Sequence, residues 1–256
     1  MTPDDLVGRK EGRTVSVVIP AFDGEAAAAA VVDSVAPLVG SLVDEIVVAD
    51  PGRWEDRGEV LWRALATTAG DLVVFVDADV VDPEPEDVSR MLGPLLTTPG
   101  LQLVKGYRRD PAGGGRVTEL LVRPLVASLC PELAGIIQPI GGDLAGTRDL
   151  LTSIPFAPGH GVDIGILLDT VAEFGTDAVG QVDLGVRESR SRPLVELGPV
   201  ARQIVATLLE RLGIEDSQAP LAQFLPDGDG YRCVRTFPMP ARAEEYACRE
   251  SHSVRT

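Results

Sequence analysis

Two aspartates that directly follow an apolar run have a spacing that could serve chemistry. Residues 72–76 are all apolar, mostly β-branched or aromatic, and predict a strand buried on both faces. Asp77 and Asp79 come next, separated by the small Ala78. Ligands bind at the carboxyl ends of strands in open α/β sheets, and two carboxylates there suit Mg²⁺ or Mn²⁺ carrying a diphosphate. The alternative is that both aspartates only end the strand and cap the next segment.

The elements that must position this pair alternate between strand and helix. Three apolar runs predict strands and two segments between them predict helices, in the order 14–20, 25–39, 44–50, 58–66 and 71–76. This alternation, with short connections, predicts a mostly parallel, doubly wound α/β sheet of the Rossmann-like kind. The strand ends at Pro20, Asp50 and Asp77 would then line one edge of the sheet.

The second half of the chain is less regular. Further helices are predicted at 88–96, 117–129, 162–174 and 195–212, and further strands at 101–107 and 178–184. After residue 214, prolines and charges predict an irregular extension packed on the domain. We therefore divide the chain into an N-terminal tail, the two halves of one α/β domain and a C-terminal extension, at residues 1–13, 14–110, 111–214 and 215–256.

Composition and charge exclude several classes of protein. With 256 residues, 45% of them hydrophobic, the chain can bury a substantial core. The net charge of −16 argues against binding to nucleic acid or to an anionic membrane surface. The three scattered cysteines form neither a disulfide framework nor a zinc pattern, which suits a reducing cytosol. Without a signal peptide or an apolar run of ~20 residues, we expect a cytoplasmic protein that does not span a membrane.

A glycine-rich segment offers a second place for chemistry. The glycines at 113–115 precede Arg116 and Thr118 at the start of a predicted helix. Backbone N–H groups in such a loop can face an anion, the guanidinium is a permanent charge, and the helix N-terminus favours a phosphate or carboxylate. The alternative is an ordinary turn followed by a helix cap, with Arg116 in solvent.

These segments carry a resemblance to a known family. The run VVIPA at 17–21 and the DAD at 77–79 resemble the nucleotide-sugar half of a GT-A glycosyltransferase. Longer stretches are similar to the glucosyl-3-phosphoglycerate synthases of actinobacteria, a retaining family; these stretches lie at 113–120, 138–142, 155–162, 185–194 and 204–209. The similarity runs from about residue 14 to residue 224, which is most of the chain.

The resemblance implies a GT-A fold, a nucleoside-diphosphate sugar donor, a small anionic acceptor, Mg²⁺ or Mn²⁺, and a homodimer. Residues that match the family's nucleotide-sugar site are Pro20, Ala21, Phe22, Glu25, Arg57, Asp77, Ala78, Asp79, Ile140 and His160. Residues that match its acceptor site are Gly115, Arg116, Val117, Thr118 and Arg190. We predict Asp79 as the metal ligand, and Asp163 and Arg192 as catalytic residues.

The chain departs from the family pattern around the nucleotide. Gly24 replaces the first acid of a pair, Pro51 replaces a serine, and Arg57 replaces a lysine. The tyrosine and glutamate of a later segment become His160 and Asp163. These changes leave open which base the donor carries. From the residues alone, His160 could equally be a loop histidine, and Asp163 a residue favoured at a helix N-terminus.

A further departure concerns the metal. Ser189 stands where the family has a metal-binding histidine, and a hydroxyl is a poorer ligand. Asp79, the diphosphate and water could hold Mg²⁺ without it, and His160 could also substitute.

The sequence therefore predicts a metal-dependent, retaining glycosyltransferase that moves a sugar from a nucleoside diphosphate to a small anionic acceptor. Two alternatives stay open at this point. One is a tailoring enzyme of specialised metabolism with an unusual activated sugar and an acceptor other than phosphoglycerate. The other is a catalytically silent homologue that binds nucleotide, which the serine at 189 favours.

Overall fold

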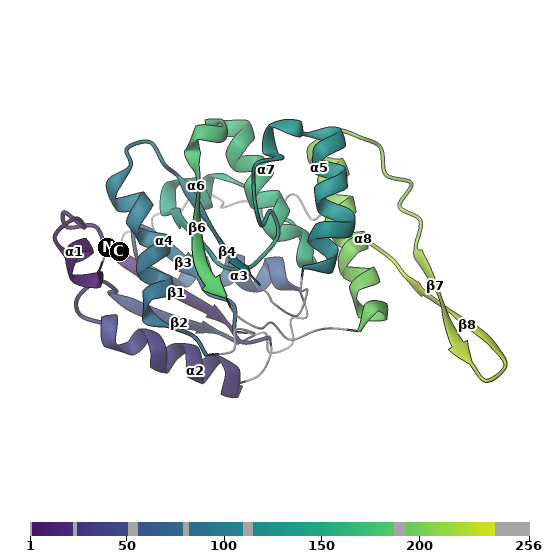
Figure 1. Ribbon diagram of the computed structural model, residues 1–256, viewed down its shortest axis with the longest axis horizontal. Coiled ribbons are helices and arrows are strands. Elements are labelled where there is room, and N and C mark those ends of the chain that lie inside the picture. The colour runs from purple at the N-terminus through teal and green to yellow at the C-terminus, as the bar shows by residue number, and fades with distance from the viewer. Residues whose placement is uncertain are drawn as a thin grey trace, which may run out of the picture.

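A six-stranded sheet forms the centre of the protein (Figure 1). The computed structural model describes residues 2–22, 25–50, 56–78, 82–109, 115–186 and 193–238. The strands are β1 (Val15–Pro20), β2 (Glu45–Ala49), β3 (Leu72–Phe75), β4 (Leu103–Arg109), β5 (Leu144–Thr147) and β6 (Val179–Val186), in the spatial order β2-β1-β3-β5-β4-β6. Only β5 runs antiparallel to its neighbours in this sheet, so the predicted mostly parallel α/β architecture is confirmed.

Helices cover both faces of the sheet. On one face lie α1 (Pro3–Val7), α2 (Glu25–Val35) and α4 (Pro85–Thr97), whose apolar residues form one core with the strands. On the other face lie α3 (Arg57–Thr67), α5 (Arg123–Leu129), α6 (Arg148–Ser153), α7 (Val162–Phe174) and α8 (Leu194–Arg211). Because both faces are covered, every position of β1 is buried. No helix in the described part of the chain is long and apolar enough to cross a membrane.

Local chemistry explains where the helices around the sheet edge begin and end. Asp56 caps α3, because its Oδ1 accepts a hydrogen bond from the backbone N–H of Glu59 at 3.1 Å. A 3₁₀ turn at Gly159–Gly161 leads directly into α7, and α7 stops at Gly175, whose φ of 82° suits glycine. A π-helical turn at Thr118–Val122 precedes α5. The starts of α3 and α7 thus face the carboxyl ends of the strands.

Two adjoining short elements within the α/β domain were not predicted from the sequence. Strand β5 and helix α6 occupy residues 144–153, where the sequence pattern indicates neither strand nor helix. The strand has only four residues and includes Gly146, so its alternation is too brief to predict a strand. Its place is decided by pairing on both sides, with β3 and with β4.

The residues predicted as an N-terminal tail are packed on the domain. Leu6 of α1 is completely buried, and Lys10 Nζ forms an ion pair with Asp44 Oδ2 at 2.7 Å. Leu6 and the adjoining Val7 are too few apolar residues to show a periodicity, so only packing reveals the role of this segment.

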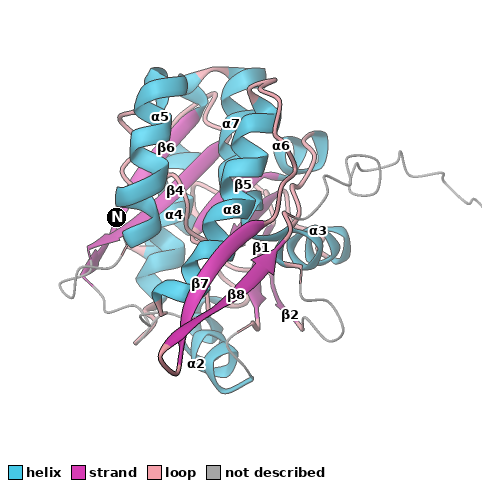
Figure 2. Cartoon of the chain, turned by 90° about the vertical axis from the view of Figure 1, so that its right-hand side faces the viewer, coloured by secondary structure: helices cyan, strands magenta, loops and turns pink. Residues whose placement is uncertain are grey.

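The C-terminal extension is more regular than predicted. Strands β7 (Leu221–Asp227) and β8 (Gly230–Thr236) form an antiparallel hairpin. The turn contains Gly228 with φ of 57°, a D-G signal that the neighbouring prolines obscured. Figure 1 shows the hairpin standing beyond α8, away from the sheet, and Figure 2 shows it in front of the domain from that side. Arg202 and Asp216 fasten its base with two hydrogen bonds of 2.8 Å, and Gln223 Nε2 on β7 donates to Val195 O on α8 at 2.9 Å, while most of the hairpin residues are exposed.

Candidate active site

Asp77 is the centre of a cluster at the carboxyl edge of the sheet. It stands two residues beyond β3, and its backbone N–H donates to Asp143 Oδ1 at 3.3 Å. Its Oδ1 accepts from Arg57 Nη2 at 3.0 Å, and its Oδ2 accepts from the backbone N–H of Gly142 at 3.1 Å. The side chain is still 24% exposed, so the cluster is open on one side to a ligand.

The surroundings of Asp77 keep it ionised. Burial acts to raise the pKa of this carboxyl, but the charge and hydrogen bond of Arg57 and the Gly142 N–H outweigh it. His160 adds to the same effect, which places the imidazole within electrostatic reach of Asp77. The net result is that the pKa of Asp77 lies below its ordinary value of 3.8.

Arg57 brings together three of the predicted residues from separate parts of the chain. Besides Asp77, its guanidinium lies against Asp163, with Nε 3.7 Å from Oδ2. The guanidinium carbon also stands 5.9 Å from the centroid of the Phe22 ring, a cation–π distance. Arg57 is itself buried, so a permanent positive charge is held inside the cluster.

Asp163 and His160 come from the loop and first turn that open α7. The Asp163 side chain is only 9% exposed, and its Oδ1 has no hydrogen-bond partner among the described residues. Two side chains hold the loop by its backbone: Gly159 N–H donates to Asp56 Oδ1 at 2.7 Å, and His160 N–H donates to Gln203 Oε1 at 3.0 Å. Asp163 is therefore both a first-turn acid and a member of the cluster.

The other predicted donor-site residues that the structure describes lie around this edge. Pro20 ends β1, and the N–H of Ala21 donates to Ala49 O at 2.9 Å, which keeps the chain extended towards Phe22. Ala78 is buried. Ile140 is half-buried and packs against the core.

A layer of buried charges beneath the cluster was not predicted. Asp143 accepts from Arg108 Nε at 2.9 Å, and Arg108 Nη2 lies 3.1 Å from Asp87 Oδ2 on α4. Lys105 on β4 is 1% exposed, and its Nζ donates to Gly141 O at 2.8 Å. Lys105 and Arg108 follow the apolar residues that begin the strand predicted at 101–107. Charged residues in that position were the sequence signal that could have revealed this buried layer.

Burial shifts the pKa of these deeper groups. Burial raises the pKa of Asp143 even though Arg108 opposes that shift. Burial lowers the pKa of Lys105, and the nearby Asp163 and Asp143 act against it. The pKa of Arg108 is raised: burial opposes the charged form, and the two acids at Asp143 and Asp87 outweigh burial.

The predicted acceptor loop is described from Gly115 onward. Gly115 has φ of 75°, which glycine adopts without strain, and its carbonyl accepts from Glu119 N–H at 2.8 Å. Thr118 is buried, Arg116 is half-buried, and Val117 packs against the core. The arginine and the hydroxyl therefore stand at the start of the helical segment, as the sequence predicted.

Several predicted residues lie outside the described residues. These are Asp79, which is the predicted metal ligand, with Arg190, Arg192 and Ser189; the side chain of Glu25 is also outside. Among the described residues, no group of three or more His, Cys, Asp or Glu side chains could hold a metal ion.

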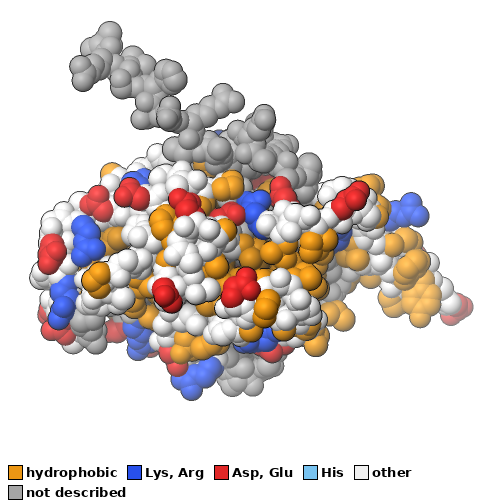
Figure 3. All heavy atoms as spheres, turned by 90° about the horizontal axis from the view of Figure 1, so that it is seen from above, with side chains coloured by type: hydrophobic (Ala, Val, Ile, Leu, Met, Phe, Trp, Pro, Cys, Tyr) orange, Lys and Arg blue, Asp and Glu red, His pale blue; other side chains and the backbone are white. Residues whose placement is uncertain are grey.

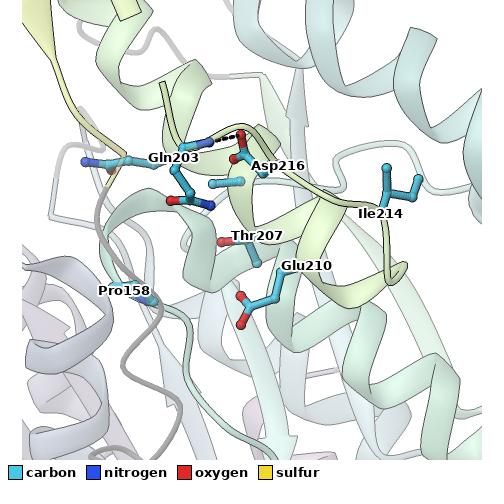
Figure 4. Close-up of a pocket in the computed structure, with 8 residues that line it drawn as sticks. Pro158, Gln203, Thr207, Glu210, Ile214 and Asp216 are labelled. Atoms are coloured by element: carbon cyan, nitrogen blue, oxygen red, sulfur yellow. Dashed lines mark hydrogen bonds between the residues drawn. The ribbon is translucent and has the colours of Figure 1, made fainter. Parts of the chain in front are cut away.

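A pocket of about 200 Å³ lies apart from the Asp77 cluster. Gln203, Thr207 and Glu210 come from α8, Pro158 from the loop before α7, and Asp216 from the segment after α8 (Figure 4). Ligand pockets usually measure about 300–1,000 Å³, so this one is too small for a sugar nucleotide. Its connection with the cluster is Gln203, which binds the backbone of His160.

Comparison with known proteins gives consistent results, although no protein-family model matches the chain. The glucosyl-3-phosphoglycerate synthase of Mycolicibacterium smegmatis is 49% identical over 266 aligned residues, which cover 90% of this chain and 88% of the relative. The Mycobacterium tuberculosis synthase crystallised with Mn²⁺, UDP and glucosyl-3-phosphoglycerate is 46% identical, with a TM-score of 0.86 over 93% of this chain and 92% of that chain. Its complex with Mn²⁺, UDP-glucose and phosphoglyceric acid has a TM-score of 0.83, at 48% identity over 88% of this chain and 89% of that chain.

The mixed α/β sheet, with its acid–arginine cluster at the carboxyl edge, defines a glycosyltransferase of the GT-A fold. At 49% identity over 88% of the length of that relative, the chain belongs to the glucosyl-3-phosphoglycerate synthase family.

Proposed function

We propose that this enzyme transfers glucose from UDP-glucose to 3-phosphoglycerate with Mg²⁺ or Mn²⁺. The observation that carries the proposal is the Arg57–Asp77–Gly142 arrangement with Asp163 beside it. It supplies one buried positive charge, two carboxylates and an opening to solvent at the edge where a nucleotide binds in such sheets. The relatives crystallised with UDP, UDP-glucose and phosphoglyceric acid support these identities.

Each residue of the cluster has a role that follows from its contacts. Arg57 lies where it can neutralise a diphosphate while it fixes Asp77. Asp163 Oδ1 offers a buried acceptor that a sugar hydroxyl can satisfy, because buried carboxylate oxygens rarely stay without a partner. Phe22 and His160 border the same region, as walls for the nucleotide. Positioning and electrostatic stabilisation then supply most of the catalysis.

The carboxylates around Asp77 fit a metal ion whose ligands come mainly from the diphosphate and from water. Both oxygens of Asp77 already accept hydrogen bonds, from Arg57 and from Gly142. Asp79 is then the carboxylate that binds the ion, with diphosphate oxygens and water completing the shell, which Mg²⁺ accepts readily. When bound, the ion stabilises the negative charge of the departing diphosphate.

The acceptor belongs at the Gly115–Thr118 segment. Arg116 can pair with the phosphate or carboxylate of phosphoglycerate, and Thr118 can donate its hydroxyl to the same anion. We also propose that the reaction retains the anomeric configuration. The resemblance to a retaining family supports this, with Asp163 orienting the sugar.

We further propose a homodimer that uses the hairpin. Phe224 and Tyr231 are 67% and 75% exposed on β7 and β8, and Phe237 follows at 67%. Figure 3 shows hydrophobic side chains along this projecting arm and on the adjoining surface. Such exposed aromatic residues favour an interface. Sedimentation velocity of the wild type and of Phe224→Asp with Tyr231→Ser tests it, and a wild-type monomer would contradict it.

We place the enzyme in the cytoplasm. Cys130 and Cys233 are free thiols, the first buried and the second exposed on the hairpin. An exposed thiol persists in a reducing compartment, whereas disulfides form in oxidising ones. Fractionation of cells that express the protein measures this directly, and recovery outside the cytoplasmic fraction would refute it.

The experiment for the activity compares wild type with Asp79→Ala. Calorimetric titration of UDP should show binding that needs Mg²⁺ or Mn²⁺, and Asp79→Ala should abolish that dependence while the fold stays intact. Asp71→Ala is the matched control, because Asp71 lies at the opposite end of β3.

Product analysis by mass spectrometry then separates the alternatives. Glucosylphosphoglycerate formed from UDP-glucose supports the proposal. Turnover only with another activated sugar or another acceptor would indicate a tailoring enzyme. Nucleotide binding without turnover of any donor would indicate a silent homologue.

A further inference from the structure

The chain contains two lysines, Lys10 and Lys105; all its other permanently basic side chains are arginines. Both lysines are buried, at 8% and 1% exposure. Lys10 is at the amino edge of the sheet, where its Nζ meets Asp44 Oδ2 at 2.7 Å and Ser41 O at 3.2 Å. Among the described residues, the hydrogen bond of Lys105 Nζ goes to a backbone carbonyl instead, that of Gly141 at 2.8 Å.

The carbonyl that Lys105 binds belongs to a peptide unit that also touches Asp77. The C=O of Gly141 and the N–H of Gly142 are the two polar ends of one peptide bond. The C=O accepts from Lys105 Nζ, and the N–H donates to Asp77 Oδ2 at 3.1 Å. The described chain has no cis peptide bond, so these ends point in opposite directions from one rigid plane. Whatever orients the carbonyl therefore orients the donor that faces Asp77.

Neither glycine of this peptide has a side chain that could secure it. A Cβ on Gly142 would lie 2.1 Å from Arg57 Nη2 and 2.2 Å from Asp77 Oδ2. Gly141 has φ of 146°, and a Cβ there would lie 2.6 Å from Gln138 Nε2. Bare backbone thus forms the wall of the site, and two glycines in sequence give that wall conformational freedom. Anchorage has to come from another element, and β4 supplies it through Lys105.

We propose that Lys105 is a positioning residue of the donor site, which fixes the Gly141–Gly142 peptide so that its N–H holds Asp77 in the orientation that binds the nucleotide. The proposal rests on the proposed function, in which Asp77 belongs to the UDP-sugar site. A buried donor also polarises the peptide that it binds, and this strengthens the hydrogen bond at the other end. Lys105 touches no reacting atom and acts through that peptide.

The test compares Lys105→Met with Lys10→Met. Methionine has nearly the length of lysine but cannot donate a hydrogen bond. Lys105→Met should raise the dissociation constant of UDP, measured calorimetrically with Mg²⁺, by roughly tenfold, and raise the KM for UDP-glucose similarly, with the KM for phosphoglycerate unchanged. Lys10→Met removes the other buried lysine, which lies at the opposite edge of the sheet. It should lower the thermal midpoint and leave both KM values unchanged.

A double-mutant cycle with Asp77→Asn tests the route of the effect. If Lys105 acts through the peptide on Asp77, the UDP affinities of Lys105→Met, Asp77→Asn and the double variant should be clearly non-additive. Strict additivity would overturn the proposed route. So would a folded Lys105→Met that binds UDP as the wild type does, or one whose loss falls on phosphoglycerate alone. Wild-type enzyme that fails to bind UDP would instead refute the proposed function.

If Lys105→Met does not fold, the wild type still allows a measurement. Labelling with ¹⁵N-lysine gives side-chain signals from only two residues, and Lys10→Met assigns them. Saturating UDP with Mg²⁺ should shift the Lys105 signal and leave the Lys10 signal in place. A Lys105 signal that does not move at saturation would overturn the proposal.

Discussion

The two edges of the central sheet use the same kind of residue in opposite ways. At the amino edge, Asp44, Glu45 and Asp71 each accept hydrogen bonds from backbone N–H groups. Lys10 pairs with the first of them, and Thr14 donates both its N–H and its hydroxyl to Asp71, at 2.7 and 2.9 Å. All three acids have a lowered pKa. At this edge, the acids use their hydrogen bonds to tie the starts of the strands together.

The carboxyl edge contains one acid, Asp163, that the described part of the chain leaves incompletely satisfied. Burial raises the pKa of Asp143. Asp163 keeps one oxygen without a hydrogen-bond partner among the described residues, and it shares Arg57 with Asp77. A buried polar atom without a partner is costly unless a ligand supplies one. The comparison shows that the acids of the amino edge serve the chain's own backbone, whereas the carboxyl edge keeps one buried carboxylate oxygen, Asp163 Oδ1, that a substrate can use.

The largest expected effect is a loss of kcat/KM when a methyl group is added at the carboxyl edge. A methyl group added at the amino edge should instead lower stability. The Cβ of Gly142→Ala would displace Arg57 and Asp77, so kcat/KM should fall by about a hundredfold while the thermal midpoint changes little. Gly70→Ala at the amino edge would put a Cβ 2.5 Å from the backbone N of Ser16. That overpacking should cost about 1–3 kcal/mol and leave kcat/KM unchanged in the folded enzyme. Calorimetric melting and steady-state kinetics measure both; a Gly142→Ala enzyme with normal kinetics would break the comparison.

A smaller effect is expected at the acceptor loop. Arg116→Ala should raise the KM for phosphoglycerate roughly tenfold, because a hydrogen bond to a charged group contributes about 1.5–3 kcal/mol. UDP affinity should barely change. Arg123→Ala removes a half-buried arginine on α5 that pairs with Glu119; it is the matched control and should leave both values near wild type. If Arg116→Ala weakens UDP binding and spares the acceptor, the loop serves the other substrate.

The smallest effect is on the pH dependence of stability, and its sign should differ between the edges. The pKa of Asp71 is lowered below 3.8 in the folded protein. Its contribution to folding stability is therefore fully present above pH 3.8 and is lost as the pH falls through the pKa of the folded state. The stability advantage of wild type over Asp71→Asn should therefore grow as the pH rises from about 3 to about 6.

Asp143 should show the opposite trend. Its pKa is raised above 3.8 in the folded protein. Its contribution to folding stability is therefore fully present below pH 3.8 and is lost as the pH rises through the pKa of the folded state. The stability of wild type relative to Asp143→Asn should therefore decline as the pH rises from about 3 to about 6. Urea unfolding at several pH values measures both trends, and parallel slopes for the two variants would contradict the contrast.

Much of the scaffold and part of the site follow from local sequence patterns. The period of the apolar residues gave the first three strands and the helices between them, because local periodicity records which faces are buried. Helix α7 matches its predicted bounds of residues 162–174. Asp77 was predicted from its place at a strand end, and the structure puts it at the carboxyl edge with Arg57 and Asp163.

Only the tertiary structure decided what completes that site. Strand β5 inserts antiparallel between β3 and β4, and this brings Gly142 and Asp143 to Asp77 across 65 and 66 residues of chain. Lys105 gained its partner in the same way, across 36 residues. A sequence determines by itself where strands end and which side chains can carry charge, because those properties depend on neighbours along the chain. Which buried charge meets which peptide depends on strand order and packing, and those are determined by the energy of the whole core.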